Sequence, residues 1–264
     1  MEDVLVVYKE TSLERYGGVD PVFLMSHDAH HRTLDTVLAA LENAGLTYSS
    51  VSRRDLTEVD SPLVVSVGGD GTFLSASQYV TYQRMLGVNS DPERSTGFYC
   101  CANSADIADC LARLDDLPKT RLNRLSLTLD GAHLPYQVLN DVLIANRSPA
   151  HLMRYRLTAD GEESEKKGCG LLVCTAAGST AWMYQEGGEV MPIQSDRMQY
   201  LVRGMRGEVP GYADRISVVS LTHEGKVFAD GEYACDLPRG SEMVLSKGTS
   251  LTVIGDLGQK QRFY

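Results

Sequence analysis

Three glycines and one aspartate stand within four consecutive positions, directly after a strand-like, mostly apolar run from Val64 to Val67. They are Gly68, Gly69, Asp70 and Gly71. Glycines let a backbone turn sharply and approach a ligand closely, and bare N–H groups at the start of a helix suit phosphate oxygens. The spacing therefore indicates a loop that binds phosphate.

The carboxylate of Asp70 is the group in this loop that could do chemistry. A negative side chain beside an anion site is costly unless it contacts a metal or accepts a proton, so the pattern favours phosphoryl transfer to a hydroxyl, with Asp70 as base or Mg²⁺ partner. The simpler interpretation is a tight strand-to-helix turn with an N-capping aspartate. Residue types alone do not separate these two interpretations.

A second candidate lies in the segment Val138 to Ile144, where Asn140 and Asp141 interrupt an apolar strand. An unpaired carboxylate inside such a strand is costly unless it meets a polar partner. A hydroxyl of a ligand is one such partner. This pair is therefore a candidate for binding a hydroxyl-bearing ligand.

A third candidate is the run from Cys174 to Trp182, in which a strand is followed by small residues and hydroxyls. Small residues let a ligand lie close, the hydroxyls of Ser179 and Thr180 satisfy polar atoms, and Trp182 offers a stacking face. The alternative is a short capped helix with a tryptophan in the core.

Two histidines, His27 and His31, are spaced one helical turn apart. Such a pair could bind a metal, but the sequence shows no third ligand nearby, which favours a solvated first turn. No metal centre is therefore expected.

The elements that must position these groups follow an alternating order in the first half. We predict strands at 4–8, 47–51 and 63–67 and a helix from Ser26 to Ala44, an alternation typical of a doubly wound, Rossmann-like α/β domain. Ligands of such domains bind beyond the carboxyl ends of the strands, which is where the glycine loop falls.

The second half changes to short alternating strands from Arg121 onward, with a hairpin signal at Asp130-Gly131 and a charged stretch, Asp160 to Lys167, expected to be an exposed loop. This pattern predicts a β-rich, sandwich-like domain. The expected division is residues 1–117 and 118–264, with the C-terminal tail packing back on the first domain.

Composition narrows the possible functions. The 264 residues are 43% hydrophobic and carry a net charge of −10, which disfavours nucleic acid and anionic membranes as partners. The N-terminus resembles neither a signal nor a transit peptide and no stretch reaches transmembrane length, so a cytoplasmic protein is expected. The six cysteines form no CxxC pair, which favours reduced thiols.

The three candidate motifs, in this order, resemble those of the NAD kinase family: a GGDGT loop, an Asn-Glu/Asp pair in a β-domain strand and a TPTGSTAY-like run. Diacylglycerol-type lipid kinases and phosphofructokinases share only the loop. The segments Gly87 to Cys100 and Leu139 to Ala145 are most similar to the mitochondrial-type and plant NADH-kinase-like branch.

The resemblance implies ATP-dependent phosphorylation of the adenosine ribose 2′-hydroxyl of NAD(H), giving NADP(H). Asp70 would be the base that takes the hydroxyl proton. The remaining implied contacts to nucleotide or substrate are Gly68, Gly69, Gly71, Thr72, Phe98, Asn140, Asp141, Ser179, Thr180, Ala181 and Trp182.

The resemblance also implies ATP with Mg²⁺, the cation not being held by a dedicated protein cage, and a homodimer or homotetramer. The sequence departs from the family pattern in three places. The pair is Asn-Asp instead of the commoner Asn-Glu, Cys169 replaces an aspartate of many bacterial relatives, and Ala176 and Ala177 replace a proline and a hydroxyl residue. The aspartate that Cys169 replaces helps to hold the nicotinamide amide in those relatives, so the preference between NAD⁺ and NADH stays open.

Two alternative functions remain at this stage. One is a lipid or sugar kinase that shares the glycine loop. The other is a dinucleotide sensor without catalysis, against which the retention of Asp70 argues, because a pure binder gains nothing from an unpaired carboxylate there.

Overall fold

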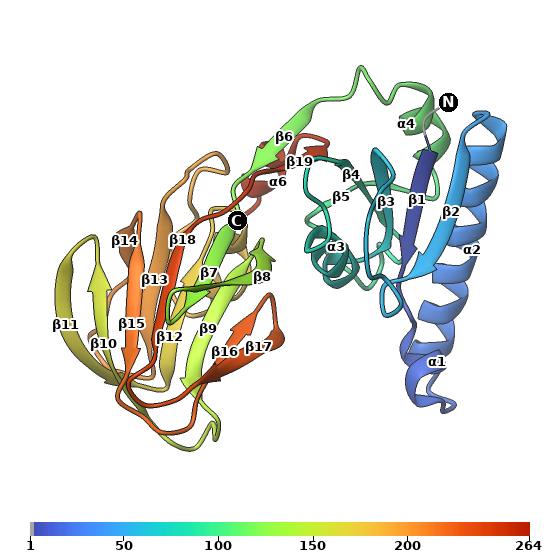
Figure 1. Ribbon diagram of the computed structural model, residues 1–264. Coiled ribbons are helices and arrows are strands. Elements are labelled where there is room, and N and C mark those ends of the chain that lie inside the picture. The colour runs from blue at the N-terminus through green and yellow to red at the C-terminus, as the bar shows by residue number, and fades with distance from the viewer. Residues whose placement is uncertain (1–2) are drawn as a thin grey trace. The chain divides into compact units, whose positions relative to one another are not determined.

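The computed structural model describes residues 3–264 (Figure 1). The chain divides into two compact units. The first runs to Arg121 and includes Leu251–Phe263, and the second is Leu122–Ser250 with Tyr264.

The first unit is built on a seven-stranded sheet. Strands β1, β2, β3, β4, β5 and β19 pair in parallel, and β6 completes the sheet. The order is β2 (Thr47–Ser52), β1 (Asp3–Tyr8), β3 (Leu63–Gly68), β4 (Arg84–Asn89), β19 (Leu251–Ile254) and β6 (Lys119–Leu122), with β5 (Cys100–Asn103) also beside β4.

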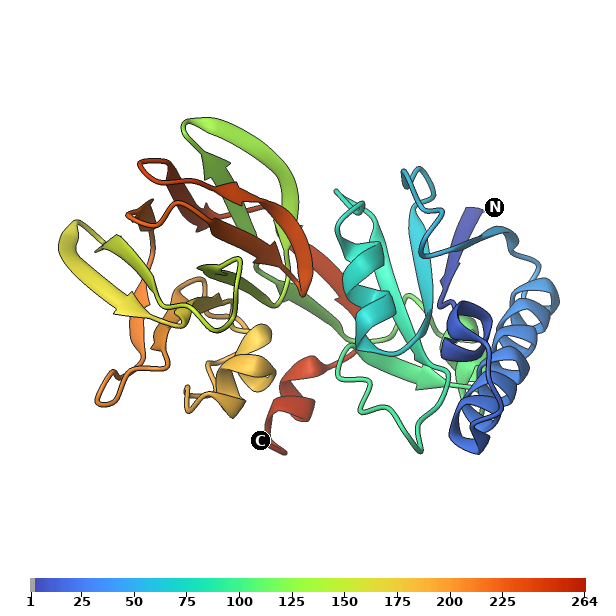
Figure 2. The same ribbon diagram turned by 90° about the horizontal axis from the view of Figure 1, so that it is seen from below.

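Helices cover both faces of this sheet. The long helix α2 (Pro21–Asn43) and α4 (Ile107–Ala112) pack on one face, where Val37 and Leu41 meet strand residues such as Val65 in a closed core. Helix α3 (Asp70–Ser77) lies on the opposite side (Figure 2). Two short helices, α1 (Ser12–Tyr16) and α6 (Leu257–Gln261), complete the unit. The doubly wound architecture predicted for the first half is confirmed.

Helix α2 begins five residues before the predicted start at Ser26. The Asp20 side chain accepts a hydrogen bond of 2.8 Å from the N–H of Val22, and Pro21 occupies the first helical position. The apolar side chains of this first turn are exposed, so periodicity gave no signal there although the capping residues did.

The second unit is a β-sandwich of two six-stranded antiparallel sheets. The first has the order β11 (Glu162–Gly168), β10 (Met153–Ala159), β15 (Ile216–Ser220), β18 (Glu242–Lys247), β7 (Leu125–Leu129), β8 (Ala132–Val138). The second has the order β14 (Gly211–Ala213), β13 (Met198–Arg203), β12 (Gly170–Cys174), β9 (Asp141–Asn146), β16 (Gly225–Ala229), β17 (Glu232–Leu237).

Alternating residues of both sheets fill the core of the sandwich. Along β12, Leu171 and Val173 enter this core, whereas Leu172 and Cys174 point outward and are covered by Met183 of a short helix, α5 (Trp182–Gln185). Successive side chains of a strand point to opposite faces, so β12 is buried on both faces, by the sandwich core on one and by α5 on the other. The β-rich second half is therefore confirmed as a sandwich.

The charged stretch Asp160 to Lys167 is not a loop. Asp160 and Gly161 form a turn with φ of 48° and 90°, and Glu162–Gly168 is edge strand β11, paired antiparallel with β10. Arg156 lies opposite Glu165 in the register, and Arg154 reaches the same Glu165 diagonally with an ion pair of 2.6 Å. The segment lacks the alternating apolar residues by which a strand is recognised in a sequence, so it was predicted to be a loop. Charged residues that form cross-strand ion pairs are nevertheless favourable in an edge strand.

The segment Val138 to Ile144 is also not one strand. Strand β8 ends at Val138 and β9 begins at Asp141, so Asn140 lies in the connection between them.

Within residues 3–264, no helix is long and apolar enough to span a bilayer.

Candidate functional site

The glycine loop lies at the carboxyl end of β3, where Gly68 ends the strand and Gly69 caps α3. The Thr72 side chain folds over Gly68 so closely that a Cβ there would lie 2.3 Å from its hydroxyl. A Cβ on Gly69 would lie 2.5 Å from the hydroxyl of Ser95. Close approach therefore favours glycine most strongly at Gly68, where the Cβ of Thr72 would also lie within 2.7 Å, and the first turn of α3 presents its N–H groups at the sheet edge.

Asp70 is the first residue of α3 and not its cap, so the interpretation as an N-capping turn is wrong. Its two carboxylate oxygens accept main-chain hydrogen bonds of 2.9 Å, one from Phe98 and one from Tyr99. A carboxylate has further lone pairs, so Asp70 holds this segment and can still accept a proton. Phe98 itself is buried, with its ring edge against Tyr99.

Three cations line a cavity of about 320 Å³ in the first unit. Lys9 follows β1, Arg53 follows β2, and Arg94 follows the turn after β4, so all three lie near the carboxyl edge of the sheet. A Cβ on Gly71 would lie 3.4 Å from Arg53 Nη1, which places the guanidinium beside the glycine loop. Burial lowers the pKa of the Lys9 ammonium, so it would gain from an anionic partner.

Sequence reasoning missed these cations. The available signal was positional: a lysine one residue after β1 and an arginine one residue after β2, in a domain whose strands end at the ligand.

The turn after β4 lines a second cavity of about 510 Å³. The N–H of Ser90 donates to the carbonyl of Gly68 at 3.0 Å, which ties this turn to the glycine loop. Asp91 pairs with Arg94 through Oδ1 at 2.9 Å. Its buried Oδ2 has no hydrogen-bond partner within residues 3–264.

In the second unit, Asn140 and Asp141 are held by Asp230, which the sequence had not singled out. The Asp230 carboxylate accepts main-chain hydrogen bonds from Leu139, Asn140 and Asp141 at 2.9, 2.7 and 3.2 Å. Burial raises the pKa of the Asp230 carboxyl to about 6, and the three main-chain hydrogen bonds, followed by the positive charge of the buried Arg124, offset part of this rise. Asp230 therefore shapes the connection that carries the Asn-Asp pair.

Asp141 carries the most strongly perturbed carboxyl of this group. It is 7% exposed, and burial, reinforced by the charge of Asp230, raises its pKa to about 7. A carboxyl that changes protonation state near neutral pH, beside a second carboxyl, is a candidate for contact with a reacting or hydroxyl-bearing ligand.

The run after β12 lies against the Asn-Asp pair. Cys174 is the register partner of Asp141, and the Thr175 hydroxyl donates to the carbonyl of Leu139 at 2.5 Å. A Cβ on Gly178 would lie 2.1 Å from the carbonyl oxygen of Asn140. The second and third motifs therefore form one surface.

In the run from Cys174 to Trp182, the side chains of Ser179 and Thr180 are buried within the fold, whereas that of Trp182 is only half-buried. The Ser179 hydroxyl donates to the carbonyl of Ala176 and accepts from the N–H of Met191, so it is engaged within the fold. Trp182 is half-buried and carries the Arg203 guanidinium over its ring at 4.4 Å, so one of its faces is already stacked. Thr180 is buried in the 3₁₀ turn Gly178–Thr180, and Ala181 joins that turn to α5.

The structure thus collects the predicted residues into two groups, one in each unit. The first contains the glycine loop, Thr72 and the segment at Phe98, and the second contains the Asn-Asp pair and the 174–182 run. A glycine loop at the carboxyl edge of a parallel sheet, with cations beside it, defines a phosphate-binding α/β protein that carries a β-sandwich.

Solved structures of this class match the whole chain. An NAD kinase from Archaeoglobus fulgidus in complex with ATP superposes with a TM-score of 0.72 at 19% identity, over 98% of this chain and 95% of the other. Yeast NADH kinase complexed with NADH gives a TM-score of 0.76 at 14% identity, over 97% of this chain and 84% of the other. At these identities the likeness establishes the fold.

Sequence relatives identify the family. A probable NADH kinase from Oryza sativa subsp. japonica is 36% identical over 242 residues, covering 77% of this chain and 74% of its own length. An NADH kinase from Arabidopsis thaliana is 35% identical over 204 residues, covering 66% and 63%. No family model matches the chain. The chain belongs to the NAD kinase family.

Proposed function

We propose that this NAD(H) kinase transfers the γ-phosphoryl group of ATP to the adenosine ribose 2′-hydroxyl of NAD(H), with Asp70 as the base. The observation that carries this proposal is the pairing of a glycine loop with a carboxylate whose oxygens are fixed by two main-chain N–H groups. The 2′-oxygen forms the new bond to phosphorus, the bond to the ADP oxygen breaks, and the hydroxyl proton passes to Asp70.

The donor side of the reaction is assigned to the first unit. Gly68, Gly69, Gly71 and Thr72 offer a backbone that a phosphate chain can approach closely, and Lys9 and Arg53 supply positive charge beside it. Mg²⁺, which prefers oxygen ligands and keeps phosphates as partners, would neutralise charge on the donor. The unpartnered Oδ2 of Asp91 is an oxygen that fits it.

The acceptor side is assigned to the second unit. Asn140 and Asp141 offer an amide and a carboxyl to ribose hydroxyls, and Thr180 and Ala181 lie in the turn packed against them. The exposed part of Trp182 is proposed to border a ring of the dinucleotide. The resemblance adds Phe98 of the first unit as a further nucleotide contact. Ser179 acts through its hydrogen bonds to Ala176 and Met191, which fix this turn.

Assembly and compartment are part of the same proposal. The edge strands of the sandwich other than the charged β11 favour self-association into a homodimer or homotetramer. All six cysteines are free, which suits a reducing compartment, and the cytoplasm is the proposed one.

The test is formation of NADP⁺ or NADPH from ATP and Mg²⁺, with NAD⁺ and NADH assayed in parallel and products separated chromatographically. We expect product with at least one acceptor, and the ratio of the two rates gives the preferred redox form. A diacylglycerol or fructose 6-phosphate product without NADP(H) would replace this proposal with the lipid or sugar kinase. Dinucleotide binding without any product would replace it with the sensor.

A further inference from the structure

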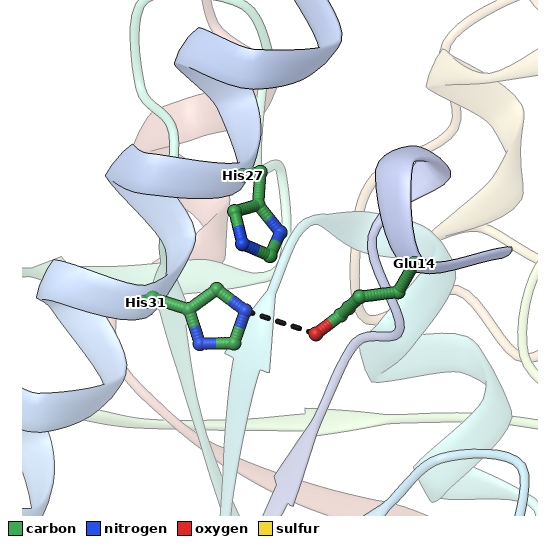
Figure 3. A group of neighbouring side chains, drawn as sticks. All are labelled: Glu14, His27 and His31. Atoms are coloured by element: carbon green, nitrogen blue, oxygen red, sulfur yellow. Dashed lines mark hydrogen bonds and ion pairs between the residues drawn. The ribbon is translucent and has the colours of Figure 1, made fainter. Parts of the chain in front are cut away.

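Three potential metal ligands from two helices meet on the surface of the first unit, beside the phosphate site and apart from its glycine loop. They are Glu14 of α1 and His27 and His31 of α2 (Figure 3). One ligand atom from each lies within 4.8 Å of the other two. We propose that these three residues bind a first-row divalent cation, with Zn²⁺ as the cation that the ligand set suits best.

The helix accounts for two of the ligands. His27 and His31 are four residues apart, so both imidazoles project from one face of α2, with ring centroids 4.3 Å apart. The third ligand, Glu14, comes from a different helix and is seventeen residues from His31 along the chain. Its Oε1 lies 3.0 Å from His31 Nε2. The sequence showed the histidine pair but not the carboxylate.

The distances are close to those of a bound site. Zinc takes nitrogen and carboxylate oxygen ligands at about 2.0–2.2 Å in a tetrahedron, which places neighbouring ligand atoms about 3.3 Å apart. The Glu14–His31 separation of 3.0 Å is slightly shorter than this value, and rotation of exposed or half-exposed side chains can bring the remaining separations, all within 4.8 Å, to it. Two imidazoles and one carboxylate leave a fourth position open to water.

Thr11 orients two of the ligands from behind. Its side chain is 3% exposed, and its hydroxyl contacts Glu14 Oε2 at 2.8 Å and His27 Nδ1 at 2.9 Å. A carboxylate oxygen can only accept, so the single hydroxyl proton goes to Glu14, and His27 Nδ1–H donates to Thr11. The Nε2 of His27 then keeps its lone pair for a metal, which is how second-shell partners prepare a histidine ligand.

The site would also stabilise an element that has little else to hold it. Helix α1 has five residues and none is buried, so its position depends on the Thr11–Glu14 capping box and on contacts to α2. A cation shared by Glu14 and the two histidines would join the helices. It would also fix the segment between Lys9 and Thr11, both of which line the cation-lined cavity.

Binding is tested on the full-length chain freed of any purification tag. Co²⁺ provides a visible absorption band for a tetrahedral site, and Zn²⁺ is titrated against it with a chelator as competitor. We expect one site per chain, and His31→Ala, His27→Ala or Glu14→Gln each to weaken Zn²⁺ binding at least about 10-fold. Thr11→Val should weaken it by about 10–100-fold through lost orientation.

The matched controls are His133→Ala and His223→Ala, which remove histidines of the second unit and should leave the affinity unchanged. Circular dichroism establishes that each variant is folded, and the rise in thermal midpoint with Zn²⁺ should be lost in the three ligand variants. Absence of Co²⁺ or Zn²⁺ binding, or binding unchanged in His31→Ala, would overturn the site. A thiolate-to-cobalt charge-transfer band would assign the metal to cysteines and overturn it as well.

Discussion

Two carboxylates, Asp70 in the first unit and Asp230 in the second, use the same device in different electrostatic surroundings. Each accepts main-chain N–H groups from a loop distant in sequence, two for Asp70 and three for Asp230. Lys9 and Arg53 border the loop of Asp70, whereas the Asp230 loop presents another carboxyl, Asp141. In the proposed function, the cation-lined first setting binds the polyanionic donor and the carboxyl-lined second setting binds the hydroxyl-bearing acceptor. The local charge therefore distinguishes two carboxylates that have similar main-chain contacts.

The largest effect is expected at Asp70. Asp70→Asn removes the proposed base, so turnover should fall by about 10²–10⁴-fold while NAD(H) binding changes little. The measurement is kcat by NADP(H) formation, with dinucleotide affinity by calorimetry. Unchanged turnover would remove Asp70 from proton transfer and make the two carboxylates alike in being purely structural.

Asp230→Asn should lower the stability of the fold and the affinity for the dinucleotide, in contrast to Asp70→Asn, which should lower turnover. The amide keeps an acceptor for Asn140 and Asp141 but turns an N–H donor toward the N–H of Leu139, leaving a donor unsatisfied at a cost of about 1–3 kcal/mol in the free energy of unfolding. Urea denaturation measures this loss. Asp130→Asn, in a similar turn on a strand that carries no predicted site residue, is the matched control for effects on dinucleotide affinity, which should weaken only in Asp230→Asn.

A smaller effect is expected from pH. The raised pKa of Asp141, about 7, means that its carboxyl is protonated below that pH in the folded chain. Loss of the acceptor should raise the KM for NAD(H) as pH falls through about 7, and Asp141→Asn should flatten this profile. Because the folded pKa exceeds the unfolded value of about 4, the contribution to stability is present below pH 4 and lost as pH rises through 7. A parallel profile in the variant would assign the titration elsewhere.

Local signals predicted what is local in this structure. A strand followed by glycines predicted the phosphate loop at a sheet edge, and alternating leucines predicted the sandwich, because both depend on neighbours in the chain. The same Asp-Gly dipeptide occurs at hairpin turns beginning with Asp130, Asp160 and Asp230, each with φ near 48°.

All three of these aspartates also accept main-chain hydrogen bonds from residues far away in the sequence. Turn chemistry predicted the hairpin at Asp130, while the segment from Asp160 was expected to be a loop and Asp230 was not singled out. Of the three aspartates, only Asp230 bonds to the Asn-Asp pair. That distinction depends on a separation of about ninety residues, which no local pattern contains. Glu14 and His31 illustrate the same limit at a shorter range.

The charged edge strand β11 has a consequence for the behaviour of the protein at high concentration. An unpaired edge can template strand addition from another molecule and begin aggregation. Between Glu162 and Lys167 nearly every side chain carries a charge on one face or the other, so an incoming strand would have to bury charge in either register. This side of the sandwich therefore resists intermolecular strand pairing.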